Sequence, residues 1–199
     1  MATPVTIRDI KTILTQPAGS RLIIVKVLTS EPGLYGLGCA TFTQRFHAVH
    51  AALEKHLKPF AIGRDVSRIE EFWQMAMVHG YWRNGPVLNN AISGIDEALW
   101  DIKGKMAGMP VYELLGGKTR EAAAVYTHAN GRTPEEVADN VEEFMEQGYR
   151  YVRIQMGGYG GKGAAMVKPE GAPEGAYYDP RDYTRKMLGM MEHVRSEVG

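Results

Sequence analysis

Arg153 is the side chain with the clearest chemical potential, because it lies in the alternating run VRIQ. Successive side chains of a strand point to opposite faces, so Val152 and Ile154 are predicted to pack against helices. Tyr151, Arg153 and Gln155 are then expected to point into the interior. A buried guanidinium needs a partner, and at the carboxyl end of a parallel strand that partner is often a substrate or a catalytic group. A structural ion pair is the alternative.

His128 lies at the end of the preceding predicted strand. A lone histidine is more often structural than functional. The carboxyl end of a strand nevertheless favours a role in substrate binding, so we predict that His128 contacts a substrate.

The glycine-rich segment GYGGKG, residues 158–163, matches the GxGxxG pattern of dinucleotide-binding loops. That pattern must open a helix, whereas KPEGAP follows at residues 168–173. A phosphate-binding P-loop is also excluded, because Gly163 follows Lys162 where Ser or Thr is required. We interpret the segment as a long loop beside an active site.

Asp96, Glu97 and Asp101 could suggest a metal site, but their spacing does not bring all three to one face of a helix. We therefore expect them to cap structure or to form hydrogen bonds between elements.

Three antiparallel strands are predicted to open the chain. β-branched residues dominate residues 5–14 and 21–29, the turn cluster QPAGS lies between them, and a third strand is expected at residues 35–41. Helical spacing follows, and Pro59 is expected to end the first helix. A later helix is predicted to begin at Asn89 or Asn90 and to end at Gly108. The side chains predicted to share the inward helix faces in this part are Val49, Leu53, His56, Leu57, Ile69, Phe72, Trp73, Met77, Ile92, Ile95, Leu99, Ile102 and Met106.

The rest of the chain has the order strand, helix, strand, helix. We predict strands at residues 122–128 and 149–155 and helices that begin at Thr133 and Asp182. Short connections in this order favour parallel strands. Val137, Val141, Phe144 and Met145 are predicted to form the buried face of the first of these helices, and Gly148 to close it.

Composition limits the function classes. Lys plus Arg and Asp plus Glu each number 23, which gives no electrostatic reason to expect nucleic acid or an anionic membrane as partner. The single cysteine, Cys39, cannot form an internal disulfide and is compatible with a reducing compartment. No apolar run is long enough to span a bilayer and no targeting signal is recognised, so a cytoplasmic location is expected.

Two further segments identify a family resemblance. GIDEALWDIKG at residues 94–104 and PVYELLGG at residues 110–117 resemble the link between capping domain and barrel in the mandelate racemase branch of the enolase superfamily. Within that branch, YTHANG and VRIQ are most similar to the mannonate and gluconate dehydratases. The resemblance implies an α+β capping domain over residues 1–118, with a three-stranded antiparallel meander plus helices. Residues 119–199 would be the first two βα units of a truncated TIM-type (β/α) barrel.

The resemblance also implies roles for single residues. Arg153 would work with a tyrosine of the following loop as the base, because a guanidinium near a phenol lowers the pKa of that phenol. Tyr159 is the candidate, with Tyr177 or Tyr178 as alternatives.

The implied substrate-binding residues are His128, Gln155, Thr43 and Gln44, of which the last two lie in a loop that closes over the substrate. Mannonate dehydratases carry asparagine about where Thr43 stands, which weakens an assignment to mannonate but not to acid sugars.

The implied activity is the Mg²⁺-assisted dehydration of an aldonate to a 2-keto-3-deoxy acid. The family's metal ligands lie on the third to fifth barrel strands, beyond Gly199, so no metal ligand is predicted here and the chain alone is expected to be inactive. A non-catalytic binding or assembly module is the alternative. A racemase or epimerase is a third possibility, opposed by Arg153 and Gln155 in place of a Lys-x-Lys pair. The expected partners are a small sugar acid and further copies of the chain.

Overall fold

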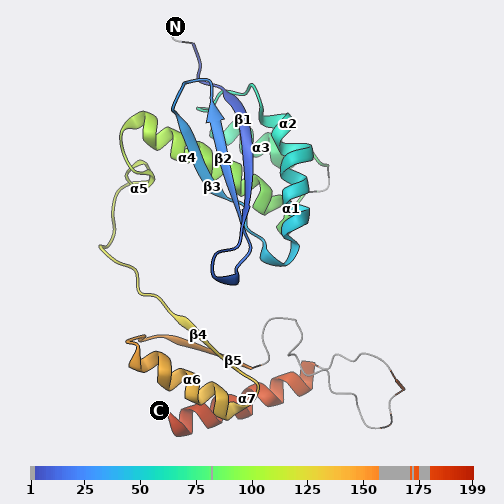
Figure 1. Ribbon diagram of the computed structural model, residues 1–199, viewed down its shortest axis with the longest axis vertical. Helices are drawn as coiled ribbons and strands as arrows, with labels where there is room; N and C mark the ends of the chain where they lie inside the picture. Colours follow the sequence, from blue (N-terminus) through green and yellow to red (C-terminus); the bar gives the residue numbers. More distant parts are fainter. Residues whose placement is uncertain (1–2, 82, 157–170, 172, 175–179) are drawn as a thin grey trace. The chain divides into compact units, whose positions relative to one another are not determined.

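The computed structural model describes residues 3–81, 83–156, 171, 173–174 and 180–199. The chain divides into two compact units, residues 1–119 and residues 120–199 (Figure 1). Each unit has its own buried hydrophobic cluster. Among the helices of the described residues, none is long and apolar enough to cross a membrane.

The first unit is built on a three-stranded antiparallel sheet, which confirms the predicted meander. Its strands, in order across the sheet, are β1 (Ile7–Thr15), β2 (Leu22–Thr29) and β3 (Tyr35–Cys39). Along β2, the β-branched residues Ile23, Val25 and Val27 alternate with partly exposed ones and are fully buried. This alternation gives the sheet one face for the hydrophobic core.

The helical segment after β3 continues past Pro59, where the sequence predicts its end. It consists of α1 (Phe46–Ala52), the π-helical turn η3 (Leu53–Leu57) and α2 (Lys58–Ala61). Proline lacks an amide N–H, and its ring clashes with the carbonyl one turn earlier in an α-helix. The wider π-helical turn just before Pro59 changes the hydrogen-bond pattern, so the chain keeps its helical course.

Three more helices complete the first unit. They are α3 (Ile69–Val78), α4 (Pro86–Ala107) and α5 (Val111–Leu114). Helix α4 begins earlier than predicted, with Gly85 as N-cap and Pro86 in the first turn, where its missing N–H costs no hydrogen bond. Its predicted end is confirmed, because Gly108 is the C-cap and adopts the left-handed conformation with φ of 66°.

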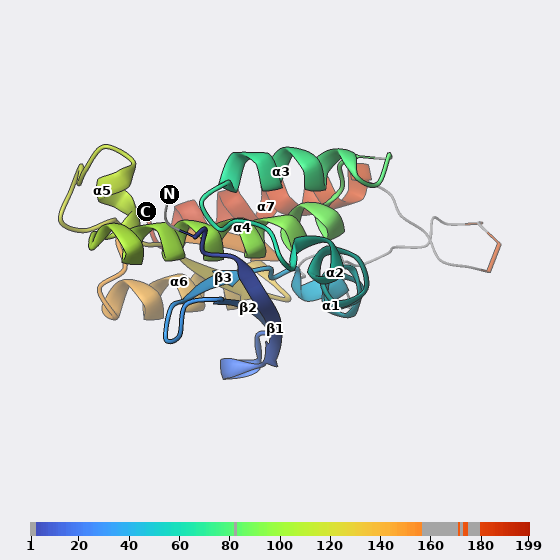
Figure 2. The same cartoon turned by 90° about the horizontal axis from the view of Figure 1, so that it is seen from above.

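Helix α4 packs against strand β3 (Figure 2). At their closest contacts there is room only for glycine. A Cβ atom at Gly36 would overlap the backbone carbonyl oxygen of Ala98, and one at Gly38 would overlap that of Gly94. A Cβ atom at Gly94 would lie 2.7 Å from the Cβ of Ala40. The glycines of β3 therefore let α4 pack directly onto the sheet.

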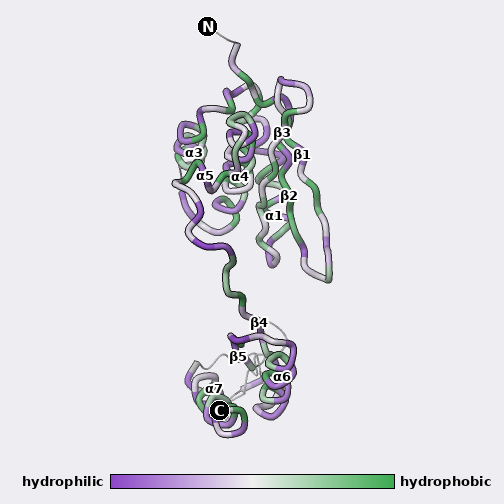
Figure 3. The backbone as a smooth tube through the Cα atoms, turned by 90° about the vertical axis from the view of Figure 1, so that its left-hand side faces the viewer, coloured by the Kyte–Doolittle hydropathy of each residue, from purple (hydrophilic) through white to green (hydrophobic). Residues whose placement is uncertain are grey.

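The second unit has the predicted order of strand, helix, strand and helix. Its elements are β4 (Thr127–Gly131), α6 (Pro134–Glu146), β5 (Val152–Met156) and α7 (Pro180–Glu197). The two strands are parallel. Strand β4 runs from Thr127 to Gly131 and not from Ala122 to His128, so His128 is its second residue and not, as predicted, its last. Strand β5 begins at Val152, opposite Thr127, and not at Tyr149. The segment just before β4 is hydrophobic (Figure 3). Its residue Val125 is exposed.

Thr133 caps helix α6 as predicted. Its hydroxyl oxygen accepts the N–H of Glu136 at 3.3 Å, and Pro134 is the first helical residue. The Glu136 carboxylate accepts the N–H of Arg132, one residue before the cap, at 2.7 Å. Gly148 follows the helix with a φ of 92°, which confirms its predicted role as the residue that closes the helix.

Four side chains predicted on inward helix faces are exposed. They are His56, and Trp73, Met106 and Met145, with 44%, 52% and 52% of their surface accessible. The apolar stripes are narrower than the sequence suggests. In α3, for example, the buried residues Phe72 and Ala76 lie four positions apart, and Trp73 falls beside their line.

Candidate active site

One face of the β4–β5 sheet carries the predicted site residues of the second unit. His128 pairs in register with Arg153, and Asn130 pairs with Gln155. Because side chains alternate along a strand, these four project from the same face, which we call the polar face of the sheet. The intervening residues pack on the other face, in one hydrophobic cluster with α6 and α7. The sheet therefore brings His128, Arg153 and Gln155 together.

Arg153 is exposed, which corrects the expectation of a buried guanidinium. Tyr151, predicted on the same interior face, has 59% of its surface accessible. Both helices of the unit pack on the opposite face of the sheet, through Val152 and Ile154 as predicted. Arg153 remains a candidate for the active site because it pairs in register with His128, and not because it is buried.

Sequence reasoning misses two neighbours of His128. The Tyr126 ring stacks on the imidazole, with centroids 5.3 Å apart and planes 23° from parallel. Asn130 shares the face of His128, and its backbone carbonyl accepts a hydrogen bond from the Asn140 side-chain amide at 2.7 Å. Counting in steps of two along the chain from His128 would have found both residues. The same alternation along β5 groups Arg153 with Gln155.

Thr43 and Gln44 lie in the first unit, in the 3-10 turn η2 (Thr43–Arg45) between β3 and α1. The Thr43 hydroxyl donates to the Gln44 side-chain oxygen at 2.9 Å, and the Arg45 guanidinium donates to the Gln44 backbone carbonyl at 2.8 Å. Gln44 is exposed and Thr43 is half-buried. Local hydrogen bonds therefore shape this turn.

The proposed base, Tyr159, lies outside the described residues, as do Tyr177, Tyr178 and the glycine-rich segment 158–163. Within the part of the chain that the structure describes, no three or more His, Cys, Asp or Glu side chains form a group that could hold a metal ion.

Glu97 and Asp101 have structural partners, as predicted. The Glu97 carboxylate accepts the backbone N–H of Cys39 at 2.8 Å, and the Asp101 carboxylate accepts that of Leu37 at 2.8 Å. Both donors lie on β3, an edge strand whose outward N–H groups need partners. Lys105 donates to the same Asp101 carboxylate at 2.7 Å. These carboxylates therefore fasten helix α4 to the sheet.

Asp96 has a different environment on the same helix. Its side chain is half-buried. Burial, and then the negative charges of Glu70 and Glu97, raise the pKa of the Asp96 carboxyl above its usual value of 3.8. The fold is therefore less stable when Asp96 is ionised than when it is neutral.

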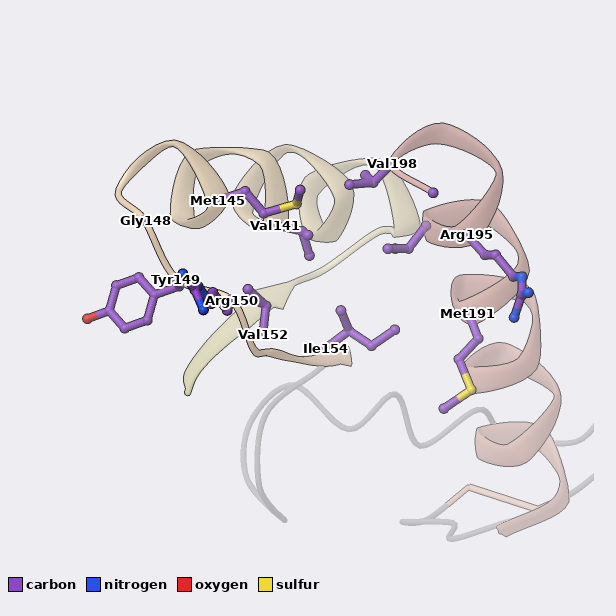
Figure 4. Close-up of a pocket in the computed structure, with 12 residues that line it drawn as sticks. Val141, Met145, Gly148, Tyr149, Arg150, Val152, Ile154, Met191, Arg195 and Val198 are labelled. Carbon is purple, nitrogen blue, oxygen red and sulfur yellow. The ribbon is translucent and has the colours of Figure 1, made fainter. Parts of the chain in front are cut away.

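A hollow of about 880 Å³ lies among α6, β5 and α7 (Figure 4). Apolar side chains such as Val141, Ile154 and Met191 line it, together with Arg150 and Arg195. It lies on the side of the sheet where the helices pack, and none of the described residues that line it is a predicted site residue. The hollow is therefore separate from the face that carries His128, Arg153 and Gln155.

Comparison with known proteins identifies the family of the chain. Residues 1–116 match the mandelate racemase / muconate lactonizing enzyme N-terminal domain. A D-galactonate dehydratase family member from Enterocloster bolteae is 56% identical over 199 residues, which cover 98% of this chain and 49% of that protein. Another, from Pantoea ananatis, is 52% identical over 210 residues, which cover 97% and 50%. The chain spans about half the length of the curated relatives it matches.

A solved structure is also similar over nearly the whole chain. It is an enolase from Pantoea ananatis with bound D-gluconate and Mg, with a TM-score of 0.83 and 50% identity over 98% of this chain and 51% of that one. The family match covers the three-stranded sheet and its helices. The chain therefore belongs to the mandelate racemase branch of the enolase superfamily and contains the N-terminal capping domain of that family.

Proposed function

We propose that this chain is part of an acid-sugar dehydratase that converts an aldonate to a 2-keto-3-deoxy acid. The observation that carries the proposal is the register of β4 and β5, which sets His128 beside Arg153 and Asn130 beside Gln155. The bound D-gluconate in the Pantoea enolase and the dehydratase names of the relatives support an acid sugar as substrate.

We further propose that residues 119–199 are the first two βα units of a (β/α) barrel, after a capping domain of residues 1–118. The parallel pairing of β4 and β5, with α6 between them in the chain and α7 after them, supports this assignment. In such barrels the active site forms at the carboxyl ends of the strands. Asn130 and Gln155 are each the last residue but one of their strands.

The polar face suits the chemistry of an aldonate. His128, Asn130 and Gln155 can donate hydrogen bonds to sugar hydroxyls or accept them. Tyr159 is proposed to remove the proton at C2 as a phenolate, which the positive charge of Arg153 would stabilise. The electron pair freed at C2 expels the C3 hydroxyl, which takes up a proton and leaves as water. The resulting enol then becomes the 2-keto-3-deoxy acid.

We include magnesium in the proposal because the similar enolase from Pantoea ananatis has Mg bound. A bound divalent cation would stabilise the negative charge that develops on the substrate carboxylate during proton removal. The described residues offer no group of three or more potential ligands, so none is assigned to a cation here. A substrate-binding role for Thr43 and Gln44 stays a prediction from the resemblance.

A chimera tests the proposal. This chain replaces the matching half of the Pantoea enolase, and the product is incubated with Mg²⁺ and a panel of aldonates, with 2-keto-3-deoxy acids measured by their semicarbazones. We expect dehydration of at least one aldonate. Arg153→Gln should lower kcat by about 100-fold or more, because it removes the charge that stabilises the base. Arg120→Gln, in the same unit but off the polar face, is the matched control.

Two results would contradict the proposal. The first is a chimera that binds aldonates but exchanges or inverts the C2 proton without loss of water, which would indicate a racemase or epimerase. The second is that Arg153→Gln and Arg120→Gln have the same activity. The isolated chain is expected to show no turnover with Mg²⁺, and turnover would refute that expectation.

A non-catalytic assembly role is the second candidate, and exposed apolar side chains in the second unit favour it. Val125, Tyr126, Leu188 and Met191 each have more than half of their surface accessible. Such surfaces are often covered by partner chains. Under this candidate the isolated chain forms defined oligomers by light scattering, whereas a compact monomer would count against it.

A further inference from the structure

A second cavity lies within the first unit, among residues that the proposed chemistry does not use. Its volume is about 220 Å³. The π-helical turn η3, the end of α3, the turn after α3 and the start of α4 all contribute to it. All four segments belong to the first compact unit.

The inner wall of this cavity is apolar. Leu57, Ala76 and Ile92 line it and are 5%, 7% and 4% exposed. An apolar cavity of about 150 Å³ is known to hold benzene, so a cavity of about 220 Å³ accommodates a ring with one small substituent. The hydroxyls of a sugar acid would find no partners on these walls, which separates this cavity from an aldonate site.

The rim of the cavity carries hydrogen-bond donors and a positive charge. His56, His79 and Arg83 are exposed there, and no Asp or Glu is among the described lining residues. The His79 imidazole packs on the Phe60 ring, with centroids 4.7 Å apart, which holds it in place. A guanidinium beside imidazole donors is suited to a carboxylate.

The backbone around the cavity is strained. Tyr81 and Asn84 adopt left-handed conformations, with φ of 56° and 85°, in the turn between α3 and α4. Such conformations cost free energy for residues other than glycine and gather at ligand-binding sites. Single π-helical turns such as η3 are also frequent at functional sites. Strain and irregular helix therefore meet at the same cavity.

We propose that this cavity binds a small monocarboxylate with a compact apolar body, such as an aromatic acid. The ring lies against Leu57, Ala76 and Ile92, and the carboxylate pairs with Arg83. This site is independent of the dehydratase reaction and adds a second ligand class to the protein.

Benzoate is the probe, titrated into the full 199-residue chain by calorimetry. We expect saturable binding, and the neutral isostere benzyl alcohol should bind about tenfold more weakly, because it cannot pair with a guanidinium. Arg83→Gln should weaken benzoate binding by about tenfold. Arg8→Gln, an exposed arginine on β1, is the matched control and should bind benzoate as the unsubstituted chain does.

Leu88→Glu provides a second test if Arg83→Gln does not fold. Leu88 lines the cavity and is 37% exposed, so a carboxylate there is tolerated by the fold but repels the ligand. D-Gluconate should not displace benzoate. The proposal is overturned if benzoate shows no saturable binding, if benzyl alcohol binds equally well, or if the Arg83 and Leu88 substitutions leave affinity unchanged. None of these results depends on turnover in the chimera.

Discussion

The two units use their polar side chains in opposite ways. In the first unit, Glu97 and Asp101 of α4 are bonded to the backbone of β3. In the second, His128 and Arg153 lie on the sheet face opposite the one where α6 and α7 pack. Glu97 and Asp101 belong to the segment 94–104 that identifies the family, and both serve the fold. The side chains proposed to carry chemistry lie on the face of the sheet away from the hydrophobic cluster of their unit.

Glycine shows the same contrast. Gly36 is required by the approach of α4, because any side chain would meet the backbone of Ala98. Gly189 lies in α7, and a Cβ atom there would meet nothing within 4 Å. Gly36 is required for the packing of α4 on β3. Gly189 has no such role and only increases the conformational entropy that the chain loses when α7 forms.

Gly36→Ala is expected to have the largest effect on stability. The new Cβ would overlap a backbone oxygen, so α4 must shift away from β3, and the free energy of unfolding should fall by about 3 kcal/mol or more. All three tryptophans, Trp73, Trp82 and Trp100, belong to the first unit, so tryptophan fluorescence in urea reports on that unit.

Gly189→Ala is the matched control, and its unfolding is measured by circular dichroism. It should stabilise the second unit by roughly 0.5–1 kcal/mol, because alanine favours a helix more than glycine does. Equal stability of Gly36→Ala and the unsubstituted chain would mean that α4 and β3 are not in close contact, and the contrast between the units would fail.

Glu97→Ala should have the next largest effect. It leaves the N–H of Cys39 without its carboxylate acceptor, and because the bond is exposed the cost should be about 1 kcal/mol. Glu97→Gln keeps a side-chain oxygen and should recover most of that loss. Gln155→Ala, on the polar face of the second unit, should change stability by less than about 0.5 kcal/mol. A larger loss from Gln155→Ala than from Glu97→Ala would reverse the comparison.

Local signals made most of the fold predictable. Alternation identified β2, and Thr133 with Pro134 identified the start of α6, because each signal is complete within a few residues. The prediction that the first helix ends at Pro59 was wrong, because the effect of this proline depends on the π-helical turn before it, which has no simple sequence signal. The start of β4 depends on where β5 begins, and that is a property of two distant segments.

The candidate site was predictable in part for the same reason. Alternation placed Arg153 and Gln155 on one face of a strand, but pairing of His128 with Arg153 is a matter of register between strands. The exposure of Arg153 could not be predicted, because it depends on which face of the sheet the helices cover. Asn130 was missed although its signal, two residues after His128, was present.

Lys58→Met tests a weaker contact of the first unit. Lys58 Nζ lies 2.8 Å from Asp9 Oδ1, with side chains 27% and 37% exposed, so removing the pair should cost only about 0.5 kcal/mol at pH 7. The hydrogen bond between them, and then their opposite charges, lower the pKa of Asp9 from 3.8 and raise the pKa of Lys58 from 10.5.

The sign of the pH dependence follows from these shifts. The contribution of Asp9 is present above pH 3.8 and is lost as the pH falls through its lower folded pKa, whereas that of Lys58 is lost as the pH rises above 10.5. The stability difference between Lys58→Met and the unsubstituted chain should therefore vanish at both extremes. Lys55→Met, an exposed neighbour on the same helical segment, should show no such profile.

Asp96→Asn should have the smallest effect and the opposite sign. Burial and the charges of Glu70 and Glu97 raise the pKa of Asp96, so the folded state holds the proton more tightly than the unfolded state does. Stability therefore falls as the pH rises from 3.8 through the folded pKa, and the full cost is present at neutral pH. Asparagine cannot ionise, so this substitution should raise the thermal midpoint slightly at pH 7 and leave it unchanged below pH 3.8. Glu70→Gln removes only one of the neighbouring charges and should give a smaller rise. A lower midpoint for Asp96→Asn at pH 7 would mean that the ionised carboxylate makes a favourable contact, and α4 would then carry a third carboxylate that holds the fold together.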